Sequence, residues 1–180
     1  MTITTSAPPP FAPPPFASPE DRGPLRFLPA LLFEDRRPAL TILVAWALTL
    51  AGSVALGFLL SRIAPQGAGP NFGKAPAWML LIGIALFSPI VETLMMGGLL
   101  ALLGRWLRPW RAVVASAALW GVFHSLLAPL WGLVVWWPFL IFSTLFVTWR
   151  RRGFWTAVAI AASVHVLQNA IPAVAAMLGF

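Results

Sequence analysis

The sequence predicts an all-α membrane protein, a polytopic bundle of about five transmembrane helices. Of its 180 residues, 59% are hydrophobic and only 9% are charged. The mean hydropathy is +0.85, which is typical of membrane proteins and not of soluble domains. The net charge is +7, but the arginines flank apolar segments as topology signals do, so we expect no nucleic-acid partner. The chain has no cysteine, which excludes disulfides, a thiol nucleophile and cysteine-based metal sites.

Five apolar segments are each close to the ~20 residues that cross the hydrocarbon core of a bilayer. Within lipid the backbone polar groups must be satisfied inside each segment, so the expected form is helical. The connecting loops are short, which makes consecutive helices antiparallel. The predicted segments are Pro38–Ile63, Pro76–Leu103, Ala112–Leu130, Gly132–Trp149 and Phe154–Leu178.

The distribution of cationic residues predicts the orientation in a cell membrane. With the N-terminus inside, ten arginines lie on the cytoplasmic side, and only Arg62 and Lys74 lie on the other. This asymmetry predicts a cytoplasmic N-terminus and an external C-terminus. The ten are Arg22, Arg26, Arg36, Arg37, Arg105, Arg108, Arg111, Arg150, Arg151 and Arg152.

The chain is expected to have two parts, a tail over residues 1–37 and a transmembrane domain over residues 38–180. A tandem PPPFA repeat occupies Ala7–Ala17 and predicts a disordered, polyproline-like cytoplasmic segment. We interpret it as a solvated tether, with a ligand for a proline-binding domain as the alternative. The segment Pro24–Pro38 mixes leucine, phenylalanine and arginine and is a candidate for lying along the inner membrane interface.

A few polar side chains within the apolar segments share one predicted depth. Glu92 precedes Arg105 by thirteen residues, and His124 follows Arg111 by thirteen. His165 likewise follows Arg152 by thirteen, so all three lie roughly 20 Å from the cytoplasmic arginines at 1.5 Å per residue. Asn169 lies four residues after His165 and therefore on the same helix face. Ionisable groups at this depth are costly, which marks the set as a functional candidate.

Three interpretations of these residues are open. Any single histidine or asparagine could be a structural hydrogen bond between helices. Together they suit hydrolysis, with a carboxylate and a histidine activating water and a histidine and an amide holding the oxyanion. Glutamate with two histidines is also a familiar zinc ligand set. We expect no metal or other cofactor, because the glutamate mechanism needs none and Asn169 is a poor zinc ligand.

The order PIVET, WGVFH and HVLQN resembles the CPBP family of intramembrane proteases, the CAAX-processing and bacteriocin-processing enzymes also called Abi proteins. The family pattern is EExxxR, then FxxxH, then HxxxN or HxxxD, and the resemblance covers about residues 76–178. Glu92 matches the first glutamate, His124 the second motif, and His165 with Asn169 the third. The resemblance implies an endopeptidase acting on a membrane-associated peptide or protein, in which Glu92 and His124 activate water. It further implies that His165 and Asn169 form the oxyanion hole.

The chain departs from this pattern at three positions. Thr93 replaces the second glutamate, Gly97 the arginine and Trp120 the phenylalanine. Because the first two positions are i and i+4, the family residues could pair as ions on one helix face, and their joint loss leaves a neutral pair. Two further hypotheses therefore stand beside the peptidase. One is a catalytically inactive relative that acts as a membrane scaffold or binds a partner, and the other is a small proton-coupled transporter.

Overall fold

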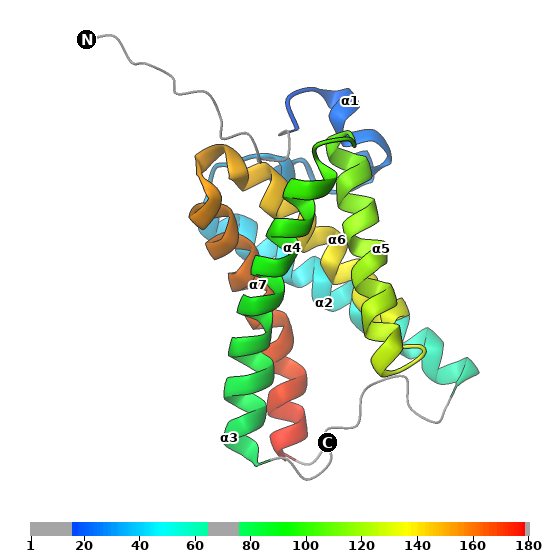
Figure 1. The fold of residues 1–180 in the computed structure, drawn as a ribbon. Coiled ribbons are helices and arrows are strands. Elements are labelled where there is room, and N and C mark those ends of the chain that lie inside the picture. The colour runs from blue at the N-terminus through cyan, green and yellow to red at the C-terminus, as the bar shows by residue number, and fades with distance from the viewer. Residues whose placement is uncertain (1–15, 65–75, 179–180) are drawn as a thin grey trace.

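The computed structural model describes residues 16–64 and 76–178, and every regular element in these ranges is helical (Figure 1). Within them, five helices are long and apolar enough to cross a membrane, which confirms the predicted all-α bundle. The second spanning helix along the chain consists of three consecutive helical elements, α3, η3 and α4. The spanning elements are α2 (Pro38–Ile63), α3 (Ala77–Met79) with η3 (Leu80–Phe87) and α4 (Ser88–Leu103), α5 (Pro109–Leu127), α6 (Gly132–Trp149) and α7 (Phe154–Leu178).

The helix ends agree closely with the sequence prediction. The bounds of α2, α6 and α7 are those predicted, whereas α5 lies three residues earlier at both ends (109 against 112, 127 against 130). Pro109 begins α5, where a fixed φ and a missing N–H suit the first helical turn. The residues after Leu127 belong instead to the tight turn into α6.

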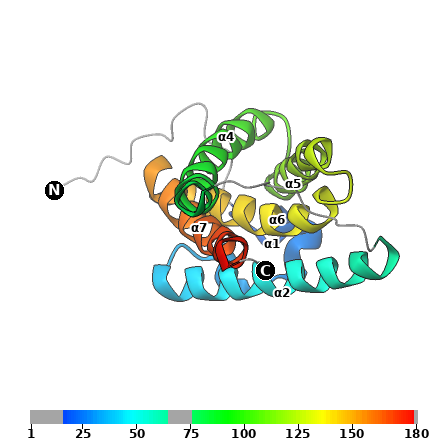
Figure 2. The same cartoon turned by 90° about the horizontal axis from the view of Figure 1, so that it is seen from below.

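The helices form three layers, with α6 and α7 in the middle (Figure 2). The outer layers are α2 on one side and α4 with α5 on the other, and α6 contacts all four of the other spanning elements. Every residue of α6 from Pro138 to Trp149 is buried. By contrast, large apolar side chains such as Phe58, Met95 and Leu126 are exposed on the outer helices. An apolar exterior of this kind suits a lipid environment.

Residues 16–37 pack against one end of the bundle, and we call them the N-terminal cap. They form α1 (Pro19–Arg22), η1 (Gly23–Phe27) and η2 (Ala30–Phe33). The cap docks on the end of α6 and on η4 (Arg150–Arg152), where Arg152 pairs with Asp35 at 3.2 Å. Five of its apolar side chains are buried, which are Phe16, Leu25, Leu28, Leu32 and Phe33.

The cap shows that the tail expected over residues 1–37 is folded in its second part, where the interfacial segment Pro24–Pro38 was expected. The expectation for the PPPFA repeat falls mostly on residues 1–15, which lie outside the described part of the chain. From Phe16 onward the leucines and phenylalanines bury their side chains against the bundle, a gain that an extended solvated tail would lack. The folded part therefore begins before Pro38.

The second spanning run changes its helical pitch just before Glu92. Its first half, η3, is a π-helix, and α4 begins at Ser88 with Pro89 in its first turn. Proline cannot donate the backbone hydrogen bond to Ala85 and disfavours a regular α-helix in the preceding turn. A π-helical turn is one way to accommodate such a break, and such turns are frequent at functional sites. The η3 turn is therefore the local backbone form that precedes Glu92.

Candidate functional site

A cavity of about 860 Å³ lies among all five spanning helices. Its wall combines the middle of α2, the junction of η3 with α4, the end of α5, the first half of α6 and the second half of α7. The four predicted site residues, Glu92, His124, His165 and Asn169, all line it. Residues from three different helices therefore converge on one space, as their common depth suggested.

Glu92 projects from the first turns of α4, and its two carboxylate oxygens have different surroundings. Oε1 accepts a hydrogen bond from the Ser88 hydroxyl one turn earlier on the same helix. Oε2 is buried and has no hydrogen-bond partner among the described residues. It lies 3.7 Å from Nε2 of His124 and 3.9 Å from Nε2 of His165. These gaps are longer than direct hydrogen bonds, so the three groups lie close together at the cavity wall without bonding one another directly.

His124 is held in place by its own helix. Its Nδ1 lies 2.8 Å from the Trp120 carbonyl oxygen, and a carbonyl can only accept, so Nδ1 carries a proton. In the neutral ring the lone pair is then on Nε2, which is the nitrogen nearest Glu92. The ring also packs edge-on against Trp131 at 4.8 Å between centroids. The imidazole orientation is thus determined before any ligand binds.

His165 is the more deeply buried of the two histidines, with 4% of its side chain exposed. It stacks on Phe142 with ring centroids 4.5 Å apart. Its Nδ1 lies 3.3 Å from the hydroxyl of Thr93. Thr93 is fully buried, so α4 supplies both the carboxylate at Glu92 and a hydroxyl partner for this histidine.

Asn169 lies one turn beyond His165 on α7. Its amide nitrogen donates to the Ile84 carbonyl of η3 at 3.3 Å. An amide nitrogen has two N–H groups, so one bond to η3 leaves the second for the cavity. The neighbouring Gln168 instead ties α7 to α2, since it accepts from Thr49 at 2.9 Å and donates to Ser53 at 3.2 Å.

The structure adds residues to the site that the sequence did not assign to it. Ser88 and Thr93 were given no role in the chemistry from the sequence, yet Ser88 bonds Glu92 and Thr93 contacts His165. The histidines are also enclosed by aromatic rings, which are Trp120, Trp131, Phe139 and Phe142. Trp120 occupies the aromatic position of the second motif, but aromatic residues are so frequent in this chain that nothing in the sequence distinguishes the other three.

The three positions that depart from the family pattern are all tightly packed. Thr93 contacts His165, as described above. A Cβ at Gly97 would lie 2.7 Å from the ring of Phe146, so no long side chain fits there. Trp120 stacks on Phe139 at 4.6 Å, and its carbonyl anchors His124. The structure therefore has a neutral α4 face where the family pattern has an ion pair.

The chemistry available to this cavity comes from one carboxylate, two imidazoles and one amide. Among the described residues, no group of three or more histidine, cysteine, aspartate or glutamate side chains is arranged to hold a metal ion. Comparisons with protein-family models, curated proteins and solved structures find no match for this chain. What the cavity can do is therefore judged from the geometry of its side chains.

Proposed function

We propose that this chain is an intramembrane endopeptidase of the glutamate type, which hydrolyses a peptide bond of a membrane-associated peptide or protein. The observation that carries the proposal is the position of the free Glu92 oxygen, 3.7 and 3.9 Å from two histidine nitrogens in a cavity among membrane-spanning helices. The motif order that resembles the CPBP proteases also supports it. Burying a carboxylate at this depth of the membrane is costly, so its presence there favours a functional role.

Glu92 and His124 are suited to activate a water molecule. The 3.7 Å gap between Oε2 and Nε2 is too long for a direct bond and suits a shared water that donates to both acceptors. Such a water directs its lone pairs away from them, toward a substrate carbonyl. As the water oxygen attacks the carbonyl carbon, its proton passes to Glu92, which then delivers it to the leaving amine.

His165 and Asn169 are suited to stabilise the oxyanion that forms during this attack. If the Thr93 hydroxyl donates to Nδ1 of His165, the neutral ring carries its proton on Nε2 and presents a donor to the cavity. The second amide N–H of Asn169 is the other donor. Fixed donors of this kind act strongly where water is scarce, because they need not reorganise as charge develops.

The aromatic and aliphatic wall would complete the site by excluding bulk water. Phe139, Phe142 and Trp131 surround the histidines, so the polar groups face a confined space. In such a space, electrostatic interactions are stronger than in water. One carboxylate would thus serve as base and then acid without a second acidic residue.

The test compares wild type with Glu92→Gln, which keeps the side-chain shape and removes the proton acceptor. Both are expressed in a membrane host, and new N-termini in the membrane fraction are identified by terminal proteomics. Peptides spanning each cleavage point are then assayed with purified protein in liposomes. We expect the variant to lose roughly 10²–10⁴-fold in rate. Ser163→Ala is the control, because Ser163 is exposed on α7 and bonds only its own helix.

Equal cleavage by wild type and Glu92→Gln would remove Glu92 from the chemistry. Absence of any Glu92-dependent product would contradict the peptidase and favour the scaffold or transporter hypotheses. A measurement of the pH inside the liposomes distinguishes these two hypotheses. When the external pH is lowered in the presence of a candidate solute, only a proton-coupled transporter acidifies the liposome interior.

A further inference from the structure

A second cavity, of about 550 Å³, lies along the outer side of α5 and α6 and shares no lining residue with the candidate site. Its wall is almost entirely apolar and runs from the N-terminal cap to the turn between α5 and α6. Characteristic lining residues are Leu25, Phe27, Val114, Ala118, Val122 and Leu126. We call it the α5–α6 groove.

The groove exists because two glycines let α5 and α6 come into backbone contact. A Cβ on Gly132 would lie 2.0 Å from the Gly121 carbonyl oxygen. Because Gly121 and Gly132 have no side chains, the bottom of the groove is formed by backbone. Larger side chains such as Val122 and Leu126 form its edges. Val122 is 57% exposed and Leu126 77% exposed, so the groove opens toward the membrane and not toward the bundle interior.

The length of the groove matches one leaflet of a bilayer. The α5 residues that line it extend from Val114 to Leu126, and twelve steps of 1.5 Å give about 18 Å. Half of a ~30 Å hydrocarbon core is about 15 Å. A single acyl chain lying along α5 would therefore be covered over most of its length.

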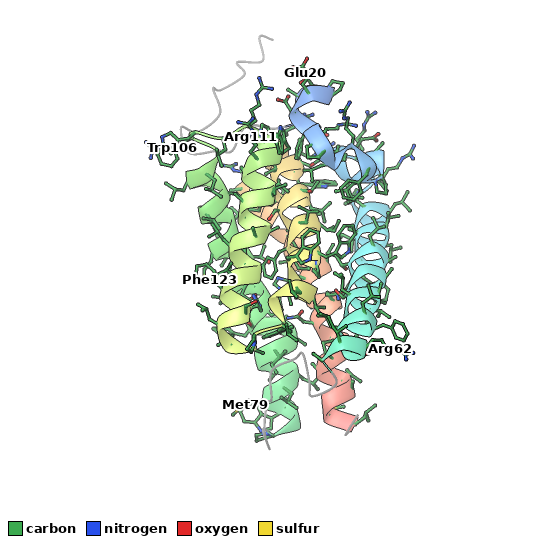
Figure 3. The ribbon with its side chains drawn as sticks, turned by 90° about the vertical axis from the view of Figure 1, so that its right-hand side faces the viewer. Glu20, Arg62, Met79, Trp106, Arg111 and Phe123 are labelled. Carbon is green, nitrogen blue, oxygen red and sulfur yellow. The ribbon has the colours of Figure 1, made fainter. Side chains whose placement is uncertain are left out.

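Positive charge gathers at the cap end of the groove. Arg26 stands between the lining residues Leu25 and Phe27, and Arg111 lies one turn before Val114. Both are exposed, and neither forms an ion pair with a carboxylate in the described part of the chain. Figure 3 shows Arg111 beside the cap, at the opposite end of the bundle from Arg62.

The acidic residues of the cap do not neutralise these arginines. Asp21 accepts hydrogen bonds from the backbone and hydroxyl of Ser18. These bonds hold its pKa below the usual value, with a smaller effect from the charge of Arg108. The other acidic residues of the cap are Glu20, Glu34 and Asp35, and Asp35 pairs with Arg152. Arg26 donates Nε to the Gly23 carbonyl at 3.0 Å, and the Arg111 guanidinium lies 5.2 Å from the centroid of the Trp110 ring. Neither contact uses all five N–H groups of a guanidinium, so both side chains retain donors for an anion outside the protein.

We propose that the α5–α6 groove binds an anionic phospholipid, with one acyl chain in the groove and the headgroup phosphate at Arg26 and Arg111. Guanidinium groups bind phosphate through paired hydrogen bonds. Arginines at the membrane surface also favour anionic over zwitterionic lipid. The apolar length and the terminal charge together select a lipid, since a free phosphate would gain nothing from the groove.

The cysteine-free sequence allows a direct test with one labelled position. Val122→Cys is labelled with a small fluorophore, and the purified full chain is placed in mixed micelles. Lipids that carry a quencher in the acyl chain are then titrated in, either as phosphatidylglycerol or as phosphatidylcholine. We expect quenching at Val122→Cys at about fivefold to tenfold lower phosphatidylglycerol than phosphatidylcholine. A label at Met95→Cys, exposed on α4, should show a smaller preference.

Three variants distinguish binding in the groove from general attraction between the cationic protein and anionic lipid. Arg26→Gln with Arg111→Gln should abolish the preference at Val122→Cys, whereas Arg36→Gln with Arg37→Gln removes the same charge from the start of α2 and should keep it. Ala118→Phe should fill the groove and reduce quenching by both lipids. Equal quenching by the two lipids, or an unchanged preference in the Arg26 and Arg111 variant, would overturn the proposal. So would protection of Val122→Cys from both lipids by a second copy of the chain.

Discussion

Thr93 is a neutral residue that contacts the candidate site at the position where the family pattern has its second glutamate. It is fully buried, and its hydroxyl lies 3.3 Å from Nδ1 of His165. Gly97, one turn later, is covered by the ring of Phe146. The two departures therefore agree with each other, because a second carboxylate at position 93 would have no cation at position 97 to pair with in this packing.

Replacement of Thr93 by valine should destabilise the protein by about 1–3 kcal/mol, because it removes the hydroxyl that lies 3.3 Å from a buried ring nitrogen of His165. Thermal unfolding of the purified protein in detergent measures the change. Thr144→Val is the matched control, since Thr144 is equally buried but bonds only the Leu140 carbonyl of its own helix. Similar losses in the two variants would show that the Thr93–His165 contact contributes nothing specific.

At the residue scale, the sequence predicted which ionisable side chains meet but not what surrounds them. Glu92, His124 and His165 could be found because charged or titratable groups are rare at membrane depth and therefore stand out. The contact of Ser88 with Glu92 could not be predicted, because serine is common in membrane helices as a packing residue. Which hydroxyl faces the cavity depends on helix rotation, and the residue pattern does not determine that.

At the scale of elements, the run formed by η3 and α4 does the most to position the site. The π-helical η3 ends at Phe87, and α4 begins at Ser88 with Pro89 in its first turn. The Ile84 carbonyl of η3 accepts a hydrogen bond from the Asn169 amide at 3.3 Å. The same run therefore positions Glu92 directly and Asn169 through its backbone. The sequence could not predict that α7 would bind this altered turn, since this requires knowing which helices are neighbours.

Packing of α4 against α6 gives a sharp prediction from two adjacent glycines. A Cβ at Gly97 would lie 2.7 Å from the Phe146 ring, whereas nothing lies within 4 Å of one at Gly98. Gly97→Ala should therefore destabilise the protein by about 1–3 kcal/mol through overpacking. Gly98→Ala should be neutral or stabilising by up to about 1 kcal/mol through helix propensity.

Thermal unfolding in detergent, with both variants measured side by side, checks this difference. Equal stability of the two alanine variants would mean that α4 does not approach α6 as described. Gly97 and Gly98 are adjacent on the same helix, so differences in expression or lipid content should affect both alanine variants equally. Which variant is the less stable therefore depends on packing alone.

At the scale of the whole molecule, the N-terminal cap covers one end of the helix bundle and is hydrogen-bonded to it. Arg151 donates to the Phe16 carbonyl, and Thr148 donates to the Leu32 carbonyl at 2.9 Å. The same end carries most of the arginines, as the sequence pattern requires if it faces the cytoplasm. The number and bounds of the spanning helices could be predicted because lipid imposes length and hydrophobicity. The folded cap could not, because it follows the proline-rich PPPFA repeat and contains no apolar segment long enough to span the membrane.

The orientation of the chain remains a prediction with a direct test. Ten cationic residues against two place the N-terminus in the cytoplasm and, with five spans, the C-terminus outside. Alkaline phosphatase fused to the C-terminus should be active, and green fluorescent protein fused to the C-terminus should not fluoresce. Green fluorescent protein fused to the N-terminus should fluoresce. The reverse pattern at the C-terminus would contradict the orientation or the number of spans.

The central claim is that side chains from three helices meet in one cavity within the membrane, and cysteine cross-linking tests it most directly. Pairs of cysteines replace Glu92, His124 and His165 in the cysteine-free chain, and membranes are treated with a short bifunctional thiol reagent. The control pairs replace Leu94, Leu126 and Leu167, each two residues further along its helix and thus turned by about 200°. The account predicts that the pairs at the site positions cross-link and that the displaced pairs do not. Cross-linking of the displaced pairs without the site pairs would contradict it.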